Sequence, residues 1–195
     1  MHEYYVLSTP DDESLCILDR ESGELCEMGW MFVKGIRARE RYGPSASLAM
    51  TGHYPGVKLT DNLINTFGYW VISEALKALL EKEAHTDIEY LPVPVINHKG
   101  RRAEGEFFIA NPFAIVDCVD LGNSNVDESQ MAPGTFGGIY RLALDRTRIP
   151  PEARLFRLKQ MPKVIIVRED LRAALDAQGL TGLSYIAMGE DCMLV

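Results

Sequence analysis

The sequence has few of the residues that mark a metal-binding, secreted or membrane protein. Four of its 195 residues are cysteines, and Cys16, Cys26, Cys118 and Cys192 show no C-x-x-C spacing. We therefore expect reduced thiols inside the fold. The four scattered histidines argue against a zinc site, so no metal is expected. The longest apolar runs, such as Val164 to Val167, are far below the roughly 20 residues of a membrane-spanning helix.

Targeting and catalytic motifs are also absent. The first twelve residues lack the basic start and the apolar middle of a signal peptide, so we expect a cytoplasmic protein. There is no G-x-S-x-G, no G-x-x-x-x-G-K-[ST], and no G-x-G-x-x-G ahead of a helix. The glycines at 134–138 lead into a strand instead. The sequence therefore gives no support for a phosphate-binding loop, and no cofactor is expected.

Charge is unevenly distributed along the chain. The net charge is −8, which argues against direct binding of nucleic acid. Residues 1–98 hold eight basic and fifteen acidic residues, and the remainder holds twelve and thirteen. The acidity is highest where a single Arg20 accompanies Asp11, Asp12, Glu13, Asp19, Glu21, Glu24 and Glu27. This segment is either a solvated hairpin or a surface that attracts a basic partner.

Short apolar segments between turn residues predict a mostly antiparallel set of strands. The expected strands are Tyr4 to Ser8, Leu15 to Asp19, Met28 to Val33, Asp87 to Val95, Phe107 to Ala110, Ala114 to Leu121, Ile139 to Leu144, Leu155 to Leu158, Val164 to Val167 and Leu183 to Met188. The segment 37–54 is rich in glycine and small residues, and we expect it to be irregular.

Two principal amphipathic helices are expected, at about 73–84 and 169–178. Ser73 is placed to cap the first of them. Apolar residues recur at helical spacing in both: Leu76, Leu79 and Leu80 in the first, and Leu171, Ala174 and Leu175 in the second. Gly179 follows the second helix at the position typical of a left-handed cap. Strands and helices together predict an α+β fold.

An internal similarity appears when the chain is shifted by 95 residues. The shift places Val71, Ile72, Glu74, Leu76, Lys77, Ala78, Leu80 and Tyr90 on Ile166, Val167, Glu169, Leu171, Arg172, Ala173, Leu175 and Tyr185. Any two strand–helix–strand segments share apolar periodicity, so the match by itself is weak evidence of duplication.

The carboxylates Asp117 and Asp120 are the best candidates for chemistry. They could share a divalent cation or act as acid and base. Residues three apart on a strand point to opposite faces, so a hydrogen-bonded strand end is the simpler interpretation. Cys118 lies between them, and the neighbouring negative charge makes it a poor nucleophile.

Two basic clusters stand out against the acidic background. His98 to Arg102 is expected at a hairpin tip, and the second cluster comprises Lys34, Arg37, Arg39 and Arg41 with Tyr42. Neither has interleaved stacking aromatics, so we interpret both as solvated loops and not as nucleic-acid sites.

From Thr60 onward the chain resembles the α+β immunity protein family of bacterial polymorphic toxin systems, the group typified by a myxobacterial kin-discrimination immunity protein. The residues that carry the resemblance are Thr60-Asp61, Val71-Ile72-Ser73-Glu74 with Leu76-Lys77, Val116-Asp117-Cys118-Val119-Asp120, Leu155-Phe156-Arg157-Leu158, Val164-Ile165-Ile166-Val167 and Gly179-Leu180-Thr181-Gly182-Leu183. It divides the chain into an acidic strand-rich segment, 1–59, and an immunity-family-like α+β region, 60–195, expected to form one domain together.

The resemblance implies a cytoplasmic, non-enzymatic protein that binds and blocks one cognate toxin domain, often a nuclease. It implies no cofactor, no nucleic-acid contact of its own and no membrane. The recurring positions Asp117, Phe156 and Gly182 are expected to maintain the fold.

Partner binding is therefore assigned to the acidic segment, whose charges can steer a basic toxin and whose aromatic residue can anchor it. The assigned residues are Asp11, Asp12, Glu13, Glu21, Glu24, Glu27 and Trp30. Two alternatives stay open: a small enzyme that uses Asp117 or Asp120, and a regulatory protein-interaction module.

Overall fold

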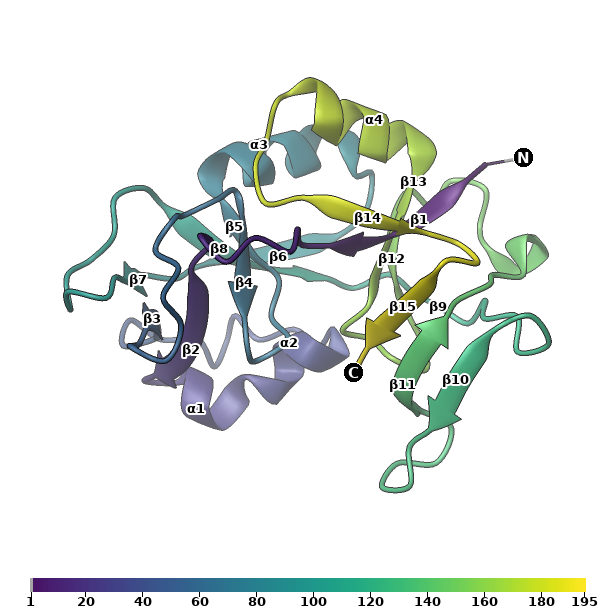
Figure 1. The fold of residues 1–195 in the computed structure, drawn as a ribbon, viewed down its shortest axis with the longest axis horizontal. Coiled ribbons are helices and arrows are strands. Elements are labelled where there is room, and N and C mark those ends of the chain that lie inside the picture. Colours follow the sequence, from purple (N-terminus) through teal and green to yellow (C-terminus); the bar gives the residue numbers. More distant parts are fainter. Residues whose placement is uncertain (1) are drawn as a thin grey trace.

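Strands make up most of the regular structure and are arranged in three sheets (Figure 1). The computed structural model describes residues 2–195. The first strands are β1 (Tyr4–Ser8), β2 (Ile17–Ser22), β3 (Ser47–Met50), β4 (Asn62–Asn65), β5 (Val71–Ser73), β6 (Ile88–Pro92), β7 (Val95–Ile96) and β8 (Phe107–Pro112). The later strands are β9 (Ile115–Val116), β10 (Asn125–Glu128), β11 (Phe136–Arg141), β12 (Leu155–Leu158), β13 (Ile165–Arg168), β14 (Ser184–Ala187) and β15 (Asp191–Leu194).

The helical elements of the described chain are α1 (Leu25–Met28), α2 (Trp30–Lys34), α3 (Glu74–Glu83), α4 (Glu169–Ala177) and the 3-10 turn η1 (Arg146–Arg148). α3 and α4 lie where the sequence predicts helices. Ser73 caps α3, because its Oγ accepts a hydrogen bond from the Leu76 N–H at 3.2 Å. The expectation of only two principal helices is wrong: α1 and α2 follow each other across Gly29 and make a third helical element.

The strand predicted for Met28 to Val33 is wrong for a physical reason. Met28, Met31 and Phe32 are all buried, and this spacing of three and four places them on one face of a helix. A Cβ on Gly29 would lie 1.6 Å from the Tyr69 hydroxyl oxygen, so glycine is required where this element presses against the sheet. Gly35 then ends α2 with a left-handed φ of 67°.

Most neighbouring strands are antiparallel, as predicted; the pairs β2–β4, β3–β7 and β9–β12 are parallel. The larger sheet has the order β6-β8-β5-β4-β2-β3-β7, the second β14-β1-β13-β12-β9, and the third β10-β11-β15. Two expectations need correction. Segment 37–54 is not wholly irregular because it contains β3, and the strand expected at Ala114 to Leu121 is only the short β9.

Five strands of the larger sheet repeat the second sheet strand by strand. The order β6-β8-β5-β4-β2 corresponds to β14-β1-β13-β12-β9, and the pairing registers agree. Corresponding pairs are Ile72–Phe108 and Val167–Tyr5, Pro92–Phe108 and Ala187–Tyr5, Asn62–Ile72 and Leu155–Val167, and Ile17–Ile64 and Ile115–Arg157. We call β2, β4, β5, β6 and β8 with α3 the first unit, and β9, β12, β13, β14 and β1 with α4 the second unit.

Side-chain contacts follow the same repeat. The Lys77 ammonium lies 4.5 Å from the ring centroid of Phe108 and 5.8 Å from that of Tyr90. In the second unit the Arg172 guanidinium lies 4.3 Å from the ring of Tyr5 and 4.8 Å from that of Tyr185. Each cation also pairs with an acid one turn later: Lys77–Glu81 in α3 and Arg172–Asp176 in α4. The 95-residue similarity is therefore a structural repeat.

The second unit takes one interior strand from the start of the chain. In the first unit β8 follows β6 in sequence and lies between β5 and β6. The corresponding position between β13 and β14 is occupied by β1, which pairs antiparallel with both. The second sheet is therefore complete only when residues 4–8 are in place.

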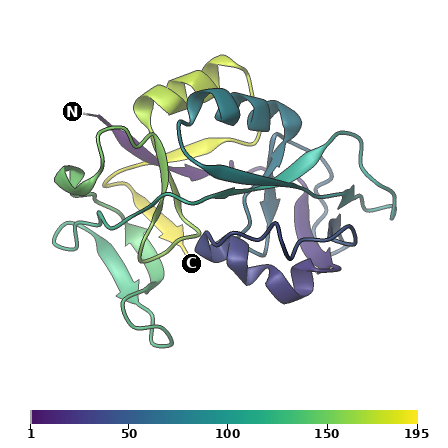
Figure 2. The same cartoon turned by 180° about the vertical axis from the view of Figure 1, so that it is seen from behind.

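The two units contact each other through related positions. Ahead of β4, the Asp61 carboxylate accepts hydrogen bonds from the Thr181 N–H and Oγ1, both at 2.8 Å. Ahead of β12, Arg154 Nη1 donates to the Glu83 carbonyl at the end of α3, at 3.1 Å. α3 and α4 lie side by side over the same side of the molecule (Figures 1 and 2).

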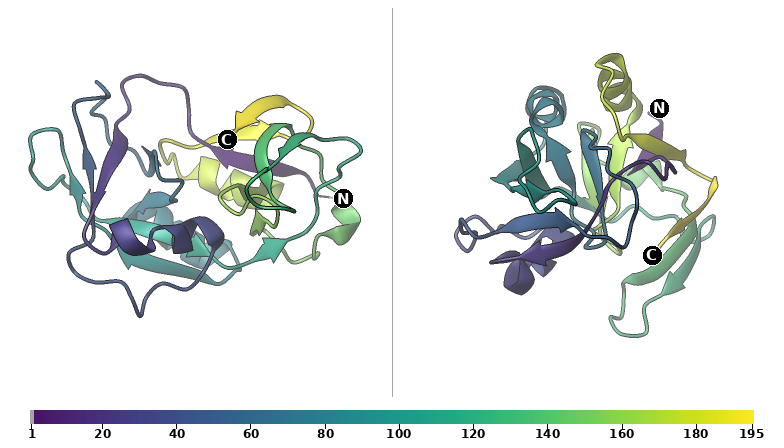
Figure 3. Two further views of the ribbon diagram at one scale, coloured as in Figure 1. Left: turned by 90° about the horizontal axis from the view of Figure 1, so that it is seen from below. Right: turned by 60° about the vertical axis from the view of Figure 1, so that its left-hand side comes forward.

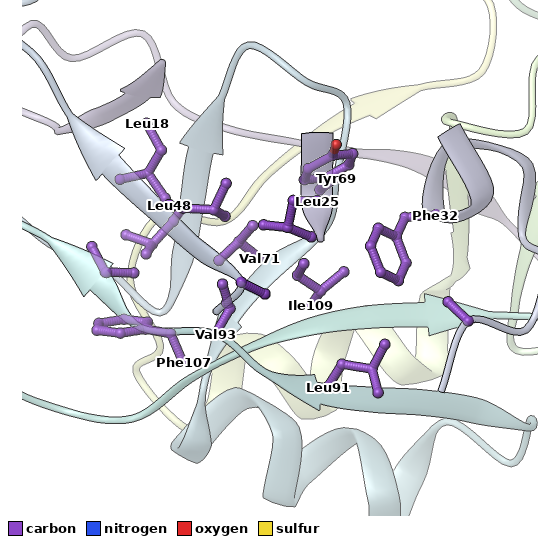
Figure 4. Close-up of a cluster of buried hydrophobic side chains, with 14 of the residues drawn as sticks. Leu18, Leu25, Phe32, Leu48, Tyr69, Val71, Leu91, Val93, Phe107 and Ile109 are labelled. Carbon is purple, nitrogen blue, oxygen red and sulfur yellow. The ribbon is translucent and has the colours of Figure 1, made fainter. Parts of the chain in front are cut away.

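Alternating strand residues build cores on both faces of the sheets. Ile72 and Val167 face the core under α3 and α4, which both units share. Val71 faces a separate core under α1 and α2, shown in Figure 4. The corresponding Ile166 packs with residues of β11 and β15 in a third core. Within residues 2–195, none of the helices has the length and apolar character needed to cross a bilayer.

Candidate functional site

The seven residues assigned to partner binding lie at the two ends of β2. Asp11, Asp12 and Glu13 are exposed in the linker between β1 and β2. Asp12 Oδ1 accepts a hydrogen bond from the Ser14 N–H at 2.9 Å, and the hydrogen bonds from Ser14 lower the pKa of this carboxyl. At the other end of β2, Glu21 and Glu24 precede α1. The structure thus separates the acidic segment into two groups.

Glu21 and Glu24 contact their own protein. Glu21 Oε2 accepts a hydrogen bond from the Tyr69 hydroxyl at 2.5 Å, and burial together with this carboxylate raises the pKa of Tyr69. The Glu24 carboxyl lies against Gly43, and the Ser45 hydroxyl lowers the pKa of Glu24. Both carboxylates therefore help to hold β2 and α1 against neighbouring segments.

Glu27 and Trp30 face solvent on the helical element. Glu27 is exposed on α1, and Trp30, the first residue of α2, is 49% exposed. The Lys34 ammonium lies 5.5 Å from the Trp30 ring centroid, one turn away, and stabilises the orientation of the ring. These two residues give α1 and α2 an exposed surface that combines a negative charge with an aromatic ring.

The acidic segment lacks neutralising cations. Across residues 2–195, none of the six carboxylates Asp11, Asp12, Glu13, Glu21, Glu24 and Glu27 forms an ion pair with a lysine or arginine. Several carboxylates elsewhere in the molecule do form such pairs. Asp117 meets Arg148 and Lys159, and Asp170 meets Arg154 and Arg168. A negative potential therefore persists around these six carboxylates.

Asp117 and Asp120 have separate structural partners. Asp117 accepts hydrogen bonds from Gln160 Nε2 at 2.7 Å and from Lys159, and these bonds lower its pKa. Asp120 accepts from the Gly122 N–H at 3.0 Å and from Asn123 Nδ2 at 2.7 Å, so it closes its own turn. Burial raises the pKa of the intervening Cys118 to about 12. Within residues 2–195 no group of three or more His, Cys, Asp or Glu side chains could hold a metal ion.

The basic clusters lie in loops as expected, except for Lys34, which is the last residue of α2. His98–Arg102 forms a hairpin tip closed by the hydrogen bond from the Asn97 N–H to the Arg101 carbonyl, 2.8 Å. In the second cluster Arg39 Nη2 donates to the Tyr90 carbonyl at 3.2 Å, and the Tyr42 hydroxyl donates to the Pro92 carbonyl at 2.8 Å. This loop therefore covers the edge of β6, which would otherwise present unpaired backbone groups.

Sequence reasoning did not identify a buried polar chain between the units. Arg157 is only 2% exposed; its Nε donates to the Pro112 carbonyl at 2.8 Å and its Nη1 to the Pro162 carbonyl at 2.5 Å. Nη2 reaches Asn111 Oδ1 at 3.3 Å, and Asn111 Nδ2 donates to Glu89 at 3.3 Å. Burial lowers the pKa of Arg157 to about 10. The sequence feature that could have revealed these contacts is a charged residue, Arg157, within the otherwise apolar strand β12.

One comparison with known proteins places the chain in a family. Residues 40–190 match the immunity protein family Imm11. The match begins ahead of Thr60 and excludes β1 and the residues at 11–30 that are assigned to partner binding. A search of curated proteins gave no match. Since the matched region covers more than half of the sequence, the chain belongs to the Imm11 immunity protein family.

Proposed function

We propose that this protein binds a cognate bacterial toxin domain in the cytoplasm and blocks its active site. Membership in the immunity protein family, through residues 40–190, is the observation that carries the proposal. In this mechanism protection comes from occupancy alone: the protein makes and breaks no covalent bond and uses no cofactor. The strength of protection then depends on the lifetime of the complex.

The toxin is proposed to be a nuclease. A protein that acts on nucleic acid presents basic groups to the phosphate backbone. The net charge of −8 and the acidic segment without lysine or arginine partners are complementary to such a groove. Complementary charge accelerates encounter more than it strengthens the final complex. We therefore assign steering to the solvent-facing carboxylates, Asp11, Asp12, Glu13 and Glu27.

Trp30 is the proposed anchor of the acidic surface. Large aromatic side chains that become fully desolvated supply much of the binding free energy at protein interfaces. The ring is half exposed and is oriented by Lys34, so little side-chain entropy is lost when a partner covers it. Glu21 and Glu24 have a supporting role here, because they fix the position of α1.

Coexpression tests the proposed function directly. The probe is the C-terminal domain of the protein encoded by the neighbouring gene, expressed with and without this chain in a sensitive host. We expect restored growth and copurification of the two proteins. Death of the host despite coexpression would reject neutralisation. Rescue without a stable complex would reject occupancy and would support the enzyme that uses Asp117 or Asp120.

Charge reversal tests the steering role. The variant Asp11→Lys/Glu27→Lys should associate roughly tenfold more slowly at low salt, because two attractive charges become repulsive. The matched control Glu104→Lys/Glu152→Lys makes the same change in net charge at two other exposed carboxylates that lack ion pairs. Stopped-flow association at several salt concentrations gives the readout. Equal rates for the two variants would contradict an acidic docking surface.

A further inference from the structure

The repeat shows where the two units differ. Each unit carries an inserted segment at the same place in its topology, between β2 and β4 in the first unit and between β9 and β12 in the second. The first insertion contributes α1, α2 and β3, and the second contributes β10, β11 and η1. Because the common framework is shared, the insertions give each unit its own surface.

Both insertions cover the sheet face opposite α3 and α4. α1 and α2 pack on the face that carries Val71, and β11 packs on the face that carries the corresponding Ile166. In Figure 1 α3 and α4 lie along the upper side of the molecule, whereas α1, α2 and the β10–β11 hairpin lie along the lower side. The view from below in Figure 3 shows both insertions. One partner on this side can therefore reach both.

The β10–β11 hairpin ends in an exposed apolar side chain on an ordered turn. Met131 is 96% exposed at the tip. Ser129 Oγ accepts hydrogen bonds from the Met131 N–H at 3.3 Å and from the Ala132 N–H at 3.2 Å. Thr135 Oγ1 donates to the Ala132 carbonyl at 2.6 Å, and the Ser129 N–H donates to the Thr135 carbonyl at 2.9 Å. An apolar side chain held on a hydrogen-bonded turn loses less entropy when it is bound.

The hairpin carries exposed carboxylates, as α1 does with Glu27. Segment 125–140 contains no lysine or arginine, and Asp127 and Glu128 on β10 are exposed. Within residues 2–195 neither carboxylate forms an ion pair; Asp127 accepts a hydrogen bond from the Tyr140 hydroxyl at 3.0 Å. The α1–α2 element and the hairpin thus each combine exposed carboxylates with an exposed large apolar side chain, Trp30 on α2 and Met131 at the tip.

From this arrangement we propose that the two insertions hold one basic toxin domain between them, with Trp30 and Met131 as the two anchors. The proposal rests on the proposed function and adds a second contact region that the acidic segment does not contain. Methionine suits a tip of this kind because its flexible thioether adapts to an apolar pocket of irregular shape. The acidic flanks, Glu27 and Asp127 with Glu128, would meet the basic rim of such pockets.

The experiment measures the affinity of single and double variants for a catalytically inactivated form of the neighbouring gene's C-terminal toxin domain. Trp30→Ser and Met131→Ser should each raise the Kd roughly tenfold, and the double variant should raise it roughly a hundredfold. Ile115→Ser truncates an exposed apolar side chain on β9, outside both insertions, and should leave the Kd unchanged. Because all three side chains are exposed, the melting temperatures of the variants should match that of the unaltered protein.

The outcomes separate this proposal from the proposed function. If the unaltered protein does not bind the toxin domain, both are rejected. If it binds and protects cells but Met131→Ser binds equally well, the two-anchor arrangement is rejected and the proposed function stands. A tenfold loss for each single variant, with Ile115→Ser unchanged, supports both anchors on one partner.

Discussion

The two units of this protein share a framework and differ in what is attached to it. Strand order and pairing registers agree across five strands, and the cations over paired aromatic rings recur at corresponding positions. The first insertion folds into helical turns against its sheet. The second extends as a hairpin into solvent (Figure 3). The comparison teaches that the framework carries stability, whereas the insertions set the shape of the exposed surface.

The junctions between the units differ as well. Arg157, Asn111 and Glu89 form the buried polar chain on one side of the molecule. The corresponding positions are occupied by Ile64, Ser8 and Ser184, as the strand registers require. A repeat need not keep its symmetry in the core, since each junction only has to satisfy its own polar groups.

Removing β1 should have the largest effect on stability. The second sheet loses an interior strand, whereas the first unit keeps its own corresponding strand, β8. Deleting residues 1–9 takes the strand between β13 and β14 out of the sheet and exposes the backbone groups of both. We expect loss of cooperative unfolding in thermal melts followed by circular dichroism. A circular permutant that carries residues 2–9 after Val195, joined by a linker about as long as segment 97–106 between β7 and β8, should restore it.

The permutant provides the control for this prediction. It contains the same strands in the sequence order of the first unit, so recovery would show that β1 contributes through its place in the sheet. A truncated chain that melts like the full one would contradict the assignment of β1 as an interior strand of the second unit.

Substitution at the junction should have the next largest effect. Arg157→Met leaves three buried acceptors without their donor and removes the positive charge that faces Glu89 through Asn111. Urea denaturation should show a loss of about 3–5 kcal/mol in the free energy of unfolding. The matched change Ile64→Met, at the corresponding position, should cost less than about 1.5 kcal/mol. Similar losses for the two variants would mean that the polar chain contributes nothing specific.

Substitution at the start of α4 should have the smallest effect on stability, and that effect should depend most strongly on pH. The N-cap residue of α3 is Ser73, whereas that of α4 is Arg168. The Arg168 side chain donates a hydrogen bond to Asp170. The hydrogen bond from Arg168 lowers the pKa of Asp170 to about 2. The folded-state pKa lies below the unfolded value, so this stabilisation is present above about pH 4 and is lost as the pH falls towards 2. Asp170→Asn should remove about 1 kcal/mol at pH 7, after allowance for solvent screening.

The measurement for Asp170 is a series of urea unfolding curves between pH 2 and pH 7. The difference between Asp170→Asn and the unaltered protein should shrink towards zero at the acid end. Asp176→Asn is the matched control, since the Asp176 side chain is 52% exposed and pairs with Arg172 one turn away. A difference that stays constant with pH would assign the effect to packing and not to the carboxylate.

Part of the architecture could be predicted from the sequence. The spacing of Leu76 and Leu80, with Ser73 ahead of them, predicts α3 and its cap, and the same periodicity predicts α4. Strand β12 lies at the predicted residues. For the candidate site, the sequence identifies the acidic segment and Trp30, but it could not foresee that β2 separates the carboxylates or that Glu21 bonds Tyr69. Those outcomes depend on segments far apart in the chain.

What the sequence determined by itself is local: helical periodicity, caps, turns and the sign of the charge. These follow from interactions within a few residues, which the spacing of side chains records directly. Only the tertiary structure decided that the 95-residue similarity is a repeat, that β1 completes the second unit and that Arg157 is buried. Each of these depends on which distant strands pair and in what register, and that is set by the combined packing of the whole core.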